Sequence, residues 1–309
     1  MAKPCPDQVF SLVAAAKLLE LFRVSPTVTS LMNNILNQLI QLQELNFAKE
    51  EQKASNSKMP LAQLEKSIAK IRAQLPEGIA DRYDRLQKRY PLAVVPLANG
   101  SCSRCALAVP TAVVNAAKAG EEMQTCPHCG RFLFYPDTVA RQPKKKHERN
   151  RPVQVGIARF SAATLMVPSL AATTREEVVG ELAKVLGDGG FAEDAATLAE
   201  LALRREAIVS TAVEHGLAFP HVRDVEGGGL TFAVGLKEKG IDFGATEDHL
   251  SKIFFFIVIP TPATAFYLRL LAGLVRTFES ADARKELLAC EKPDEMWKTL
   301  VKLTKDSVP

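Results

Sequence analysis

The segment RREAIVSTAVEHGLAFPHVRD, residues 204–224, carries the pattern on which the fold and chemistry of the second half of the chain depend. It begins at the end of a predicted helix, and Gly216 and Pro220 then constrain a loop that presents His221. Neutral imidazole is a competent nucleophile toward phosphorus near neutral pH, because its pKa is close to that pH. Arg205 adds a guanidinium of the kind that binds phosphoryl oxygens in pairs. From this pattern alone, a surface or core histidine is the commoner interpretation.

The sequence around this segment predicts an α/β domain. Thr174 and Glu177 form a capping box ahead of VVGELAKVLG, which predicts a helix that stops at Gly187. Two short apolar runs bounded by Gly, Asp or Pro are typical of buried strands. Strands and helices that alternate along a chain favour a mostly covered sheet. The other predicted elements are a helix over 193–206, strands over 230–236 and 252–259, and helices over 264–279 and 293–304.

Residues 204–224 resemble the signature of the fructose/mannitol-type enzyme IIA domain (type 2, including nitrogen-regulatory IIA-like proteins) of the sugar phosphotransferase system. The resemblance extends over about residues 160–303 and includes the stretch 240–260. It implies an α/β domain with a mixed sheet flanked by helices. It also implies that His221 receives phosphate from a histidine phosphocarrier protein and that Arg205 stabilises the phosphohistidine. The matching positions are Arg205, Glu206, Ser210, Thr211, Gly216, Ala218, Pro220 and His221.

Two positions depart from the family pattern. The family usually has a His in the helix after the last strand, where this chain has Tyr267 before Leu268. A tyrosine hydroxyl can hydrogen-bond a phosphate, but it does not exchange protons near neutral pH as a histidine does. The second departure is Glu214, whose negative charge would disfavour a phosphoryl group if it faced the site.

Four cysteines predict a metal site in the first half of the chain. Cys102 and Cys105 form one CxxC pair, and Cys126 and Cys129 form a second after 20 intervening residues. This spacing is typical of a structural, closed zinc site, and disulfides or a redox CxxC are the less favoured alternatives. Within the second pair, His128 is a less favoured ligand that we expect to be exposed. Cys5 and Cys290 lie outside any CxxC pair.

Heptad spacing predicts two helices ahead of the cysteines. The first stripe is Val28, Leu31, Ile35, Leu42 and Leu45, with Gln38 at the missing seam position; the second is Leu61, Leu64, Ile68, Ile71 and Leu75. Two such stripes predict an antiparallel hairpin, with an ordinary small helical bundle as the alternative. A further helix is predicted over residues 7–23. With the motif CPHCGRFLFY at 126–135, residues 28–137 resemble the coiled-coil and C4-type zinc-ribbon family, which implies protein or nucleic-acid contacts.

Charge is divided unevenly along the chain. Residues 1–154 carry a net charge of +9 and residues 155–309 a net charge of −5, which suggests two parts with different partners. We therefore expect a helical hairpin or coiled coil over 1–90, a C4 zinc ribbon over 91–139, a basic linker over 140–154 and an IIA-like domain over 155–309. No apolar run is long enough to span a membrane, so a cytoplasmic protein is expected.

Three functions remain open at this stage. The first is a phosphoryl carrier active at His221, a transferase-type role that we favour together with the second. The second is a regulator that senses phosphorylation and docks a protein or nucleic acid through the zinc-ribbon hairpin, with an enzyme IIB or a regulatory protein as phosphoryl acceptor. The third is a structural adaptor whose IIA-like domain has lost its chemistry, and the changes at Glu214 and Tyr267 are the reason to consider it.

Overall fold

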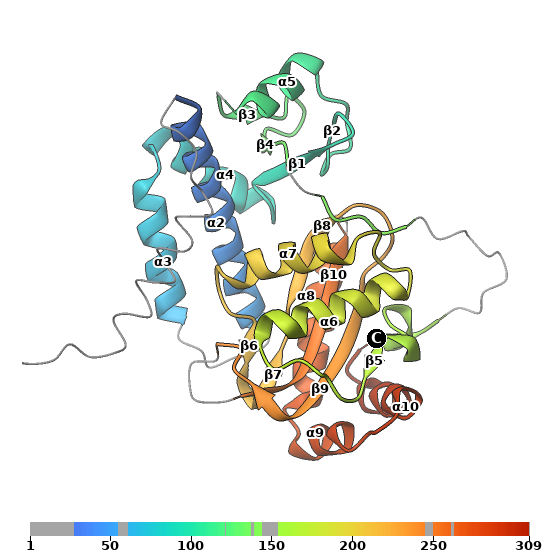
Figure 1. Cartoon of the computed structure of the whole chain (residues 1–309). Helices are drawn as coiled ribbons and strands as arrows, with labels where there is room; N and C mark the ends of the chain where they lie inside the picture. Colours follow the sequence, from blue (N-terminus) through green and yellow to red (C-terminus); the bar gives the residue numbers. More distant parts are fainter. Residues whose placement is uncertain are drawn as a thin grey trace, which may run out of the picture.

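A computed structural model describes residues 28–54, 61–120, 122–136, 139–143, 154–244, 250–260 and 263–308 of the chain (Figure 1). The helix predicted over residues 7–23, Cys5 and most of the basic linker lie outside these residues. Ala140 and Gln142, at the start of that linker, exchange backbone hydrogen bonds with Glu226 of the second half. The chain entering the linker is therefore paired with the α/β domain.

A helical hairpin opens the described chain. Its two helices are antiparallel. Lys49 pairs with Glu65 near one end of the hairpin, and Gln38 pairs with Gln74 nearer the other. Leu39 is fully buried and Gln38 lies at the exposed edge of the seam. The seam therefore uses Leu39 where the heptad pattern placed Gln38, since an amide side chain is better accommodated near water. The helices are α2 (Val28–Ala54), α3 (Leu61–Gln74) and α4 (Glu77–Arg89).

The zinc-ribbon segment packs on the hairpin. The buried Gln43 side chain of α2 accepts hydrogen bonds from Ala93 N and Val94 N and donates one to Val94 O. Arg82 of α4 donates to Gly130 O at 3.0 Å. These bonds hold the hairpin and the ribbon together as one unit. The ribbon contains β1 (Val94–Ala98), β2 (Ser101–Cys102), α5 (Thr111–Ala119), β3 (Gln124–Thr125) and β4 (Phe132–Phe134), in the sheet order β2-β1-β4-β3.

The second half contains a mixed sheet with strand order β5-β9-β10-β7-β6, in which β8 also pairs with β10. Its two long central strands, β9 and β10, are antiparallel, whereas β7 and β8 follow one another along the other edge of β10 and run parallel to it. The expected mixed sheet is therefore present. The strands are β5 (Met166–Val167), β6 (Ala212–Val213), β7 (Leu217–Ala218), β8 (His221–Val225), β9 (Thr231–Ile241) and β10 (Ser251–Pro260).

Helices flank this sheet (Figure 1). The predicted capping box at Thr174 and Glu177 is present with both of its hydrogen bonds. Phe255 of β10 is fully buried and packs on the rings of Phe219, Phe232 and Phe278. This apolar centre fixes the strand that carries His221 beside β10. The helices are η1 (Gly156–Arg159), η2 (Ala163–Leu165), α6 (Arg175–Asp188), α7 (Ala195–Glu206), η3 (Glu214–Gly216), α8 (Thr264–Phe278), α9 (Ala281–Leu288) and α10 (Pro293–Thr304).

The C-terminal half of α2 packs against α8 of the second domain. Ala48 and Glu51 of α2 therefore line the same small cavity as Tyr267 and Leu271 of α8. The hairpin thus lies against the part of the α/β domain that contains His221. Among the described residues, no helix combines the length and apolar character needed to cross a membrane.

Candidate functional site

His221 is the first residue of β8, so the sequence-based placement in a loop is wrong by a small margin. The amide of Ile257 on β10 donates to Pro220 O, and this bond together with the parallel register between His221 and Ile257 extends the sheet to the histidine. Gly216, with φ of 74°, closes the preceding turn in a backbone conformation that favours glycine. The residue is 1 % exposed, and its imidazole is fully shielded. It faces α2 rather than solvent.

The two ring nitrogens of His221 have different partners. Nδ1 lies 3.0 Å from Phe219 O, and a carbonyl oxygen can only accept, so Nδ1 carries the proton. Nε2 then keeps its lone pair and accepts from Arg223 Nη2 at 3.2 Å. Burial, together with the charges of Arg205 and Arg223, lowers the pKa of His221 to about 3 against the opposing charge of Glu51. The imidazole is therefore neutral and nucleophilic at Nε2 at ordinary pH.

Two arginines flank this nitrogen. Arg205, near the C-terminal end of α7, donates from Nη1 to Val209 O at 2.9 Å, which fixes the direction of its guanidinium. Arg223 lies two residues after His221 on the same strand, and its guanidinium stacks 4.0 Å from the centre of the Phe47 ring. Arg223 is not one of the residues that the sequence pattern predicted for this site. An alternating strand places residues two apart on one face, and this spacing is the signal that identifies it.

Two carboxylates from α2 neutralise these arginines. Glu51 Oε2 lies 3.2 Å from Arg205 Nη2, and Glu51 Oε1 hydrogen-bonds Arg223 Nη2 and lies 3.4 Å from His221 Nε2. Glu44 Oε2 lies 3.1 Å from both Arg205 Nε and Arg223 Nη1. Burial opposes ionisation of Glu51, but the charges of Arg223 and Arg205 outweigh it and lower the Glu51 pKa to about 2. Sequence analysis missed both carboxylates.

Tyr267 occupies the position where the enzyme IIA pattern has a histidine, and the structure places it beside His221. Its hydroxyl lies 3.4 Å from His221 Nδ1, and the two ring centres are 5.3 Å apart. Burial and the charge of Glu51 raise the pKa of Tyr267 well above its usual value. Tyr267 is therefore a neutral hydroxyl that faces the same carboxylate as the arginines. Glu214, the other departure, lies in η3 between β6 and β7.

The Glu and Thr of the family pattern hold the backbone that leads to His221. Glu206 accepts from Thr211 N at 2.7 Å and from the Thr211 hydroxyl at 2.6 Å. Burial raises the pKa of Glu206 despite these two bonds. Ser210 donates from its hydroxyl to Phe243 O at 2.5 Å. These residues fix the turn between α7 and β6, and Phe219 N closes it by donating to Thr211 O.

We expect the α/β domain to lose stability in acid because of His221. The unfolded imidazole titrates near 6.5 and the folded one near 3, so below pH 6.5 the unfolded state binds a proton that the folded state does not. The free energy of unfolding should then fall by up to about 1.4 kcal/mol per pH unit, or about 2 kcal/mol between pH 7 and 5. The groups around the imidazole are Glu51, Arg205, Arg223 and Tyr267.

Urea unfolding at about pH 7 and about pH 5 measures this loss. The single tryptophan, Trp297 in α10, packs against the core of the α/β domain and reports its unfolding by fluorescence. His221→Gln should remove most of the difference between the two pH values. His215→Asn is the matched control, since His215 is exposed and asparagine tolerates its φ of 66°. An equal loss in all three proteins would show that His221 is not the group responsible.

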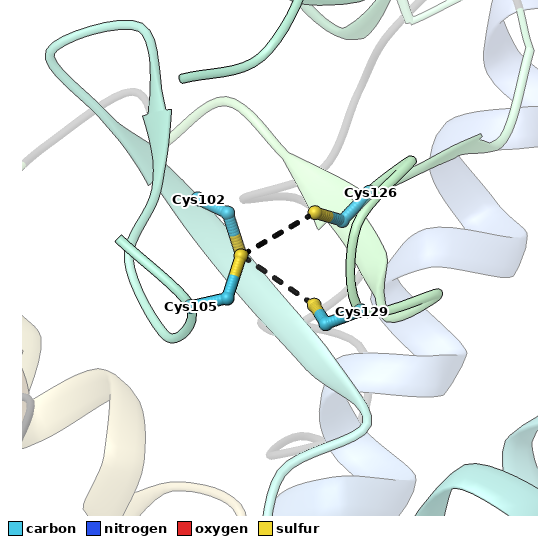
Figure 2. Close-up of side chains that lie close together, drawn as sticks. All are labelled: Cys102, Cys105, Cys126 and Cys129. Atoms are coloured by element: carbon cyan, nitrogen blue, oxygen red, sulfur yellow. Dashed lines mark hydrogen bonds between the residues drawn. The ribbon is translucent and has the colours of Figure 1, made fainter. Parts of the chain in front are cut away.

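The four cysteines of the two CxxC pairs come together between two loops of the ribbon (Figure 2). Their sulfur atoms all lie within 4.8 Å of one another, with Cys102 Sγ 3.9 Å from Cys129 Sγ and Cys105 Sγ 3.7 Å from Cys126 Sγ. A disulfide bond is about 2 Å long, so these thiols are free. Four sulfurs at about 2.3 Å from a central zinc would stand about 3.8 Å apart. The donor set therefore fits a tetrahedral zinc ion.

Local turns and side chains shape this cluster. Gly100 and Gly130 adopt φ of 73° and 75°, which supports the predicted turns beside each pair. His128 is exposed and its Nε2 lies 3.0 Å from Ala108 O, outside the sulfur cluster. Arg104, between the first two cysteines, forms a 2.5 Å ion pair with Asp224 of β8. The loop of the first CxxC pair is thus joined to the strand that carries His221. Cys290 is buried in the α/β domain.

Comparison with known proteins places these two regions in families. The family model described as "Phosphoenolpyruvate-dependent sugar phosphotransferase system, EIIA 2" matches residues 160–302. The "PTS system fructose-specific EIIA component" of Haloferax volcanii is 30 % identical over 118 residues, which cover 38 % of this chain and 77 % of that protein. The chain belongs to this EIIA 2 family. A C4-type zinc ribbon model matches residues 101–133.

Two further similar proteins have regulatory names. A "Nitrogen regulatory protein" of Bradyrhizobium diazoefficiens is 24 % identical over 139 residues, 45 % of this chain and 90 % of that protein. The crystal structure of Nitrogen Regulatory Protein IIA-Ntr from Neisseria meningitidis aligns with a TM-score of 0.42 and 21 % identity, covering 46 % of this chain and 97 % of that one. Arg205, His221, Arg223 and Tyr267 lie inside the EIIA 2 match, whereas the α2 carboxylates lie outside it.

Proposed function

We propose that this EIIA 2 protein is a phosphoryl carrier that is phosphorylated on His221 Nε2. The observation that carries the proposal is the arrangement around that nitrogen. His221 Nδ1 is held by Phe219 O, and Arg223 donates to Nε2. Arg205 and Arg223 both pair with the Glu51 carboxylate, which lies beside Nε2. A nucleophile with its proton on the far nitrogen and two guanidiniums beside its lone pair is suited to phosphoryl transfer, which depends on positioning and charge stabilisation.

The transfer step follows from this geometry. The Nε2 lone pair attacks the phosphorus of a phosphohistidine on a histidine phosphocarrier protein, and a phosphorus–nitrogen bond forms as the donor's bond breaks. The donor ring keeps the electron pair of its broken bond, and the Nδ1 proton of His221 stays on Nδ1, hydrogen-bonded to Phe219 O, so the phosphorylated ring carries a positive charge. Arg205 and Arg223 balance the charge of the phosphoryl oxygens. The same step in reverse direction passes the group to an enzyme IIB or a regulatory protein.

The hairpin and the ribbon support a regulatory role beside carriage. Gln43 joins α2 to β1, and Arg104 joins the cysteine loop to Asp224 on the His221 strand. We propose that the four cysteines, Cys102, Cys105, Cys126 and Cys129, bind one structural zinc ion, because four sulfurs at tetrahedral spacing leave no open position for chemistry. The ribbon would then offer a surface to a protein or nucleic-acid partner, and this surface would be linked to His221 through these contacts.

Labelling with phosphate tests the carrier role. Zinc-loaded protein incubated with phosphoenolpyruvate, enzyme I and the phosphocarrier protein should take up about one phosphoryl group per chain. His221→Gln should take up none, while His215→Asn, at an exposed histidine six positions earlier in the chain, should label as the wild type does. Label that survives His221→Gln would place the phosphoryl group elsewhere.

A non-catalytic adaptor is the alternative, and Tyr267 is the observation that favours it. A neutral tyrosine beside His221 cannot shuttle a proton at ordinary pH in the way a histidine does. An unlabelled wild type together with intact folding and zinc binding would support the adaptor. Labelling at His221 would exclude it.

A further inference from the structure

We infer that the N-terminal hairpin is a built-in plug of the His221 site, with the Glu51 carboxylate in the position of the phosphoryl group, so that docking of α2 and phosphorylation of His221 exclude each other. The inference rests on the proposed function, because it concerns the regulation of the same site. It adds an intramolecular ligand that comes from outside the EIIA 2 match.

The contacts of Glu51 are those a phosphoryl group on Nε2 would make. One carboxylate oxygen pairs with Arg205, and the other pairs with Arg223 and lies 3.4 Å from His221 Nε2. Tyr267 lines the same small cavity as Glu51, and its hydroxyl lies 3.4 Å from His221 Nδ1. Carboxylate and phosphate share the geometry that guanidiniums recognise in pairs. Glu51 therefore fills the binding groups that the proposed reaction requires.

The position of α2 also closes the route to the nucleophile. The His221 side chain is fully shielded and the Arg205 and Arg223 side chains are 8 % and 9 % exposed, with Glu51 and Glu44 lying against them. Phosphoryl transfer between two proteins needs the donor phosphorus in line with the attacking lone pair. Glu51 stands at that position. The donor can reach Nε2 only after α2 leaves.

Charge makes the two states exclusive. In the docked state, the positive charges of Arg205 and Arg223 are balanced by Glu44 and Glu51, and His221 is neutral. A phosphoryl group carries a charge of about −2 at neutral pH, and the ring becomes positive because Nδ1 keeps its proton, so adding the group to the docked site would leave about one uncompensated negative charge in a buried cluster. With α2 released, the negative charges of the phosphoryl oxygens take the place of the two carboxylate charges beside the arginines.

The face of α2 that docks is built for this contact. Glu44, Phe47 and Glu51 recur at helical spacing, and Phe47 lies under the Arg223 guanidinium between the two carboxylates. Coupling between two exclusive states is reciprocal at equilibrium, so docking disfavours the phosphorylated state by the same factor by which phosphorylation weakens docking. Because Gln43 fixes α2 to β1, the ribbon moves with the hairpin. The phosphorylation state of His221 would thereby control whether the hairpin and ribbon are held or free.

Removing the two charges tests the plug on the full zinc-loaded chain. Glu44→Gln with Glu51→Gln keeps the size of both side chains but leaves the arginines without counter-charges in the docked state. We expect His221 to be labelled about ten-fold faster or more in this double variant. The matched control is Glu50→Gln, because Glu50 is exposed on the same helix and pairs with Lys53. Labelling of the double variant at the wild-type rate would overturn the inference.

Hydrogen exchange of the α2 amides gives a readout that needs no phosphoryl donor. Unphosphorylated wild type should protect residues 44–54, whereas the double variant and the phosphorylated wild type should exchange faster there. Equal protection of α2 in the wild type and the double variant would contradict the plug. If neither protein takes up label, the carrier role fails, while the exchange comparison still decides whether the carboxylates hold α2 on the site.

Discussion

Replacing Arg205 by Met in the Glu44→Gln, Glu51→Gln background is expected to slow the phosphorylation of His221 by about 100-fold or more. The guanidinium of Arg205 is directed at the group beside Nε2 by its bond to Val209 O. Losing one pre-positioned donor to a developing oxyanion typically costs about 100- to 1,000-fold in rate. Cationic groups at a transferring phosphoryl are among the largest contributions to catalysis of this class.

The background is needed because Arg205 acts on two equilibria in the wild type. Removing it leaves Glu44 and Glu51 buried beside a single arginine, which destabilises the docked hairpin. Breaking a buried ion pair by deleting one partner costs about 3–5 kcal/mol. Release of α2 would speed labelling, while loss of the guanidinium that binds the phosphoryl oxygens would slow it. Variants that already lack both carboxylates isolate the second effect.

Two further substitutions make the result specific. Arg204→Met removes the neighbouring charge on α7, which is exposed and pairs with Glu200, so its rate should equal that of the background. Arg205→Lys keeps one positive charge without the paired donors and should give an intermediate rate. Rates are read from initial labelling by phosphoenolpyruvate, enzyme I and the phosphocarrier protein. Equal rates in the Arg204 and Arg205 variants would show that Arg205 does not act on the phosphoryl group.

Local signals were sufficient for much of the fold. The capping box at Thr174, the apolar runs of β9 and β10 and the two CxxC pairs each act within a few residues, so short-range rules describe them. The hairpin register was nearly right, because a heptad pattern locates a buried face, although Leu39 rather than Gln38 occupies the seam. The sequence did not predict α9 (Ala281–Leu288), because this helix is short and its few apolar residues form only a weak helical pattern.

The charge cluster at His221 is the part that sequence reasoning did not reach. Glu51 and Arg205 are separated by 154 positions, and Glu44 and Arg223 by 179. A heptad pattern assigns both carboxylates to the side of α2 away from its seam, where a solvated charge is the ordinary interpretation. Only the packing of α2 on α8 turns that side toward the arginines. The family match does not include the two α2 carboxylates either, since it begins after the hairpin.

Chelation of zinc is expected to unfold the ribbon while leaving the α/β domain folded. The ribbon core around the metal consists of few apolar side chains, among them Leu97, Val109 and Leu133 packed with the cysteines. A cluster of this size supplies little stability by itself, whereas structural zinc sites contribute about 10–16 kcal/mol of apparent binding free energy. The α/β domain has its own extensive core around Phe255 and does not depend on the metal.

Hydrogen exchange and metal analysis measure this outcome together. Protein as purified should contain about one zinc per chain, and replacing Cys102 and Cys126 by Ser should remove it and abolish protection over residues 101–133. His128→Ala, which alters the second CxxC pair without touching a sulfur, should keep both the metal and the protection. In the metal-free cysteine variant, Arg104 loses its fixed position opposite Asp224, so zinc loss should also loosen the ribbon from β8. A protected ribbon in metal-free protein would refute the structural role, because the apolar cluster would then hold the fold unaided.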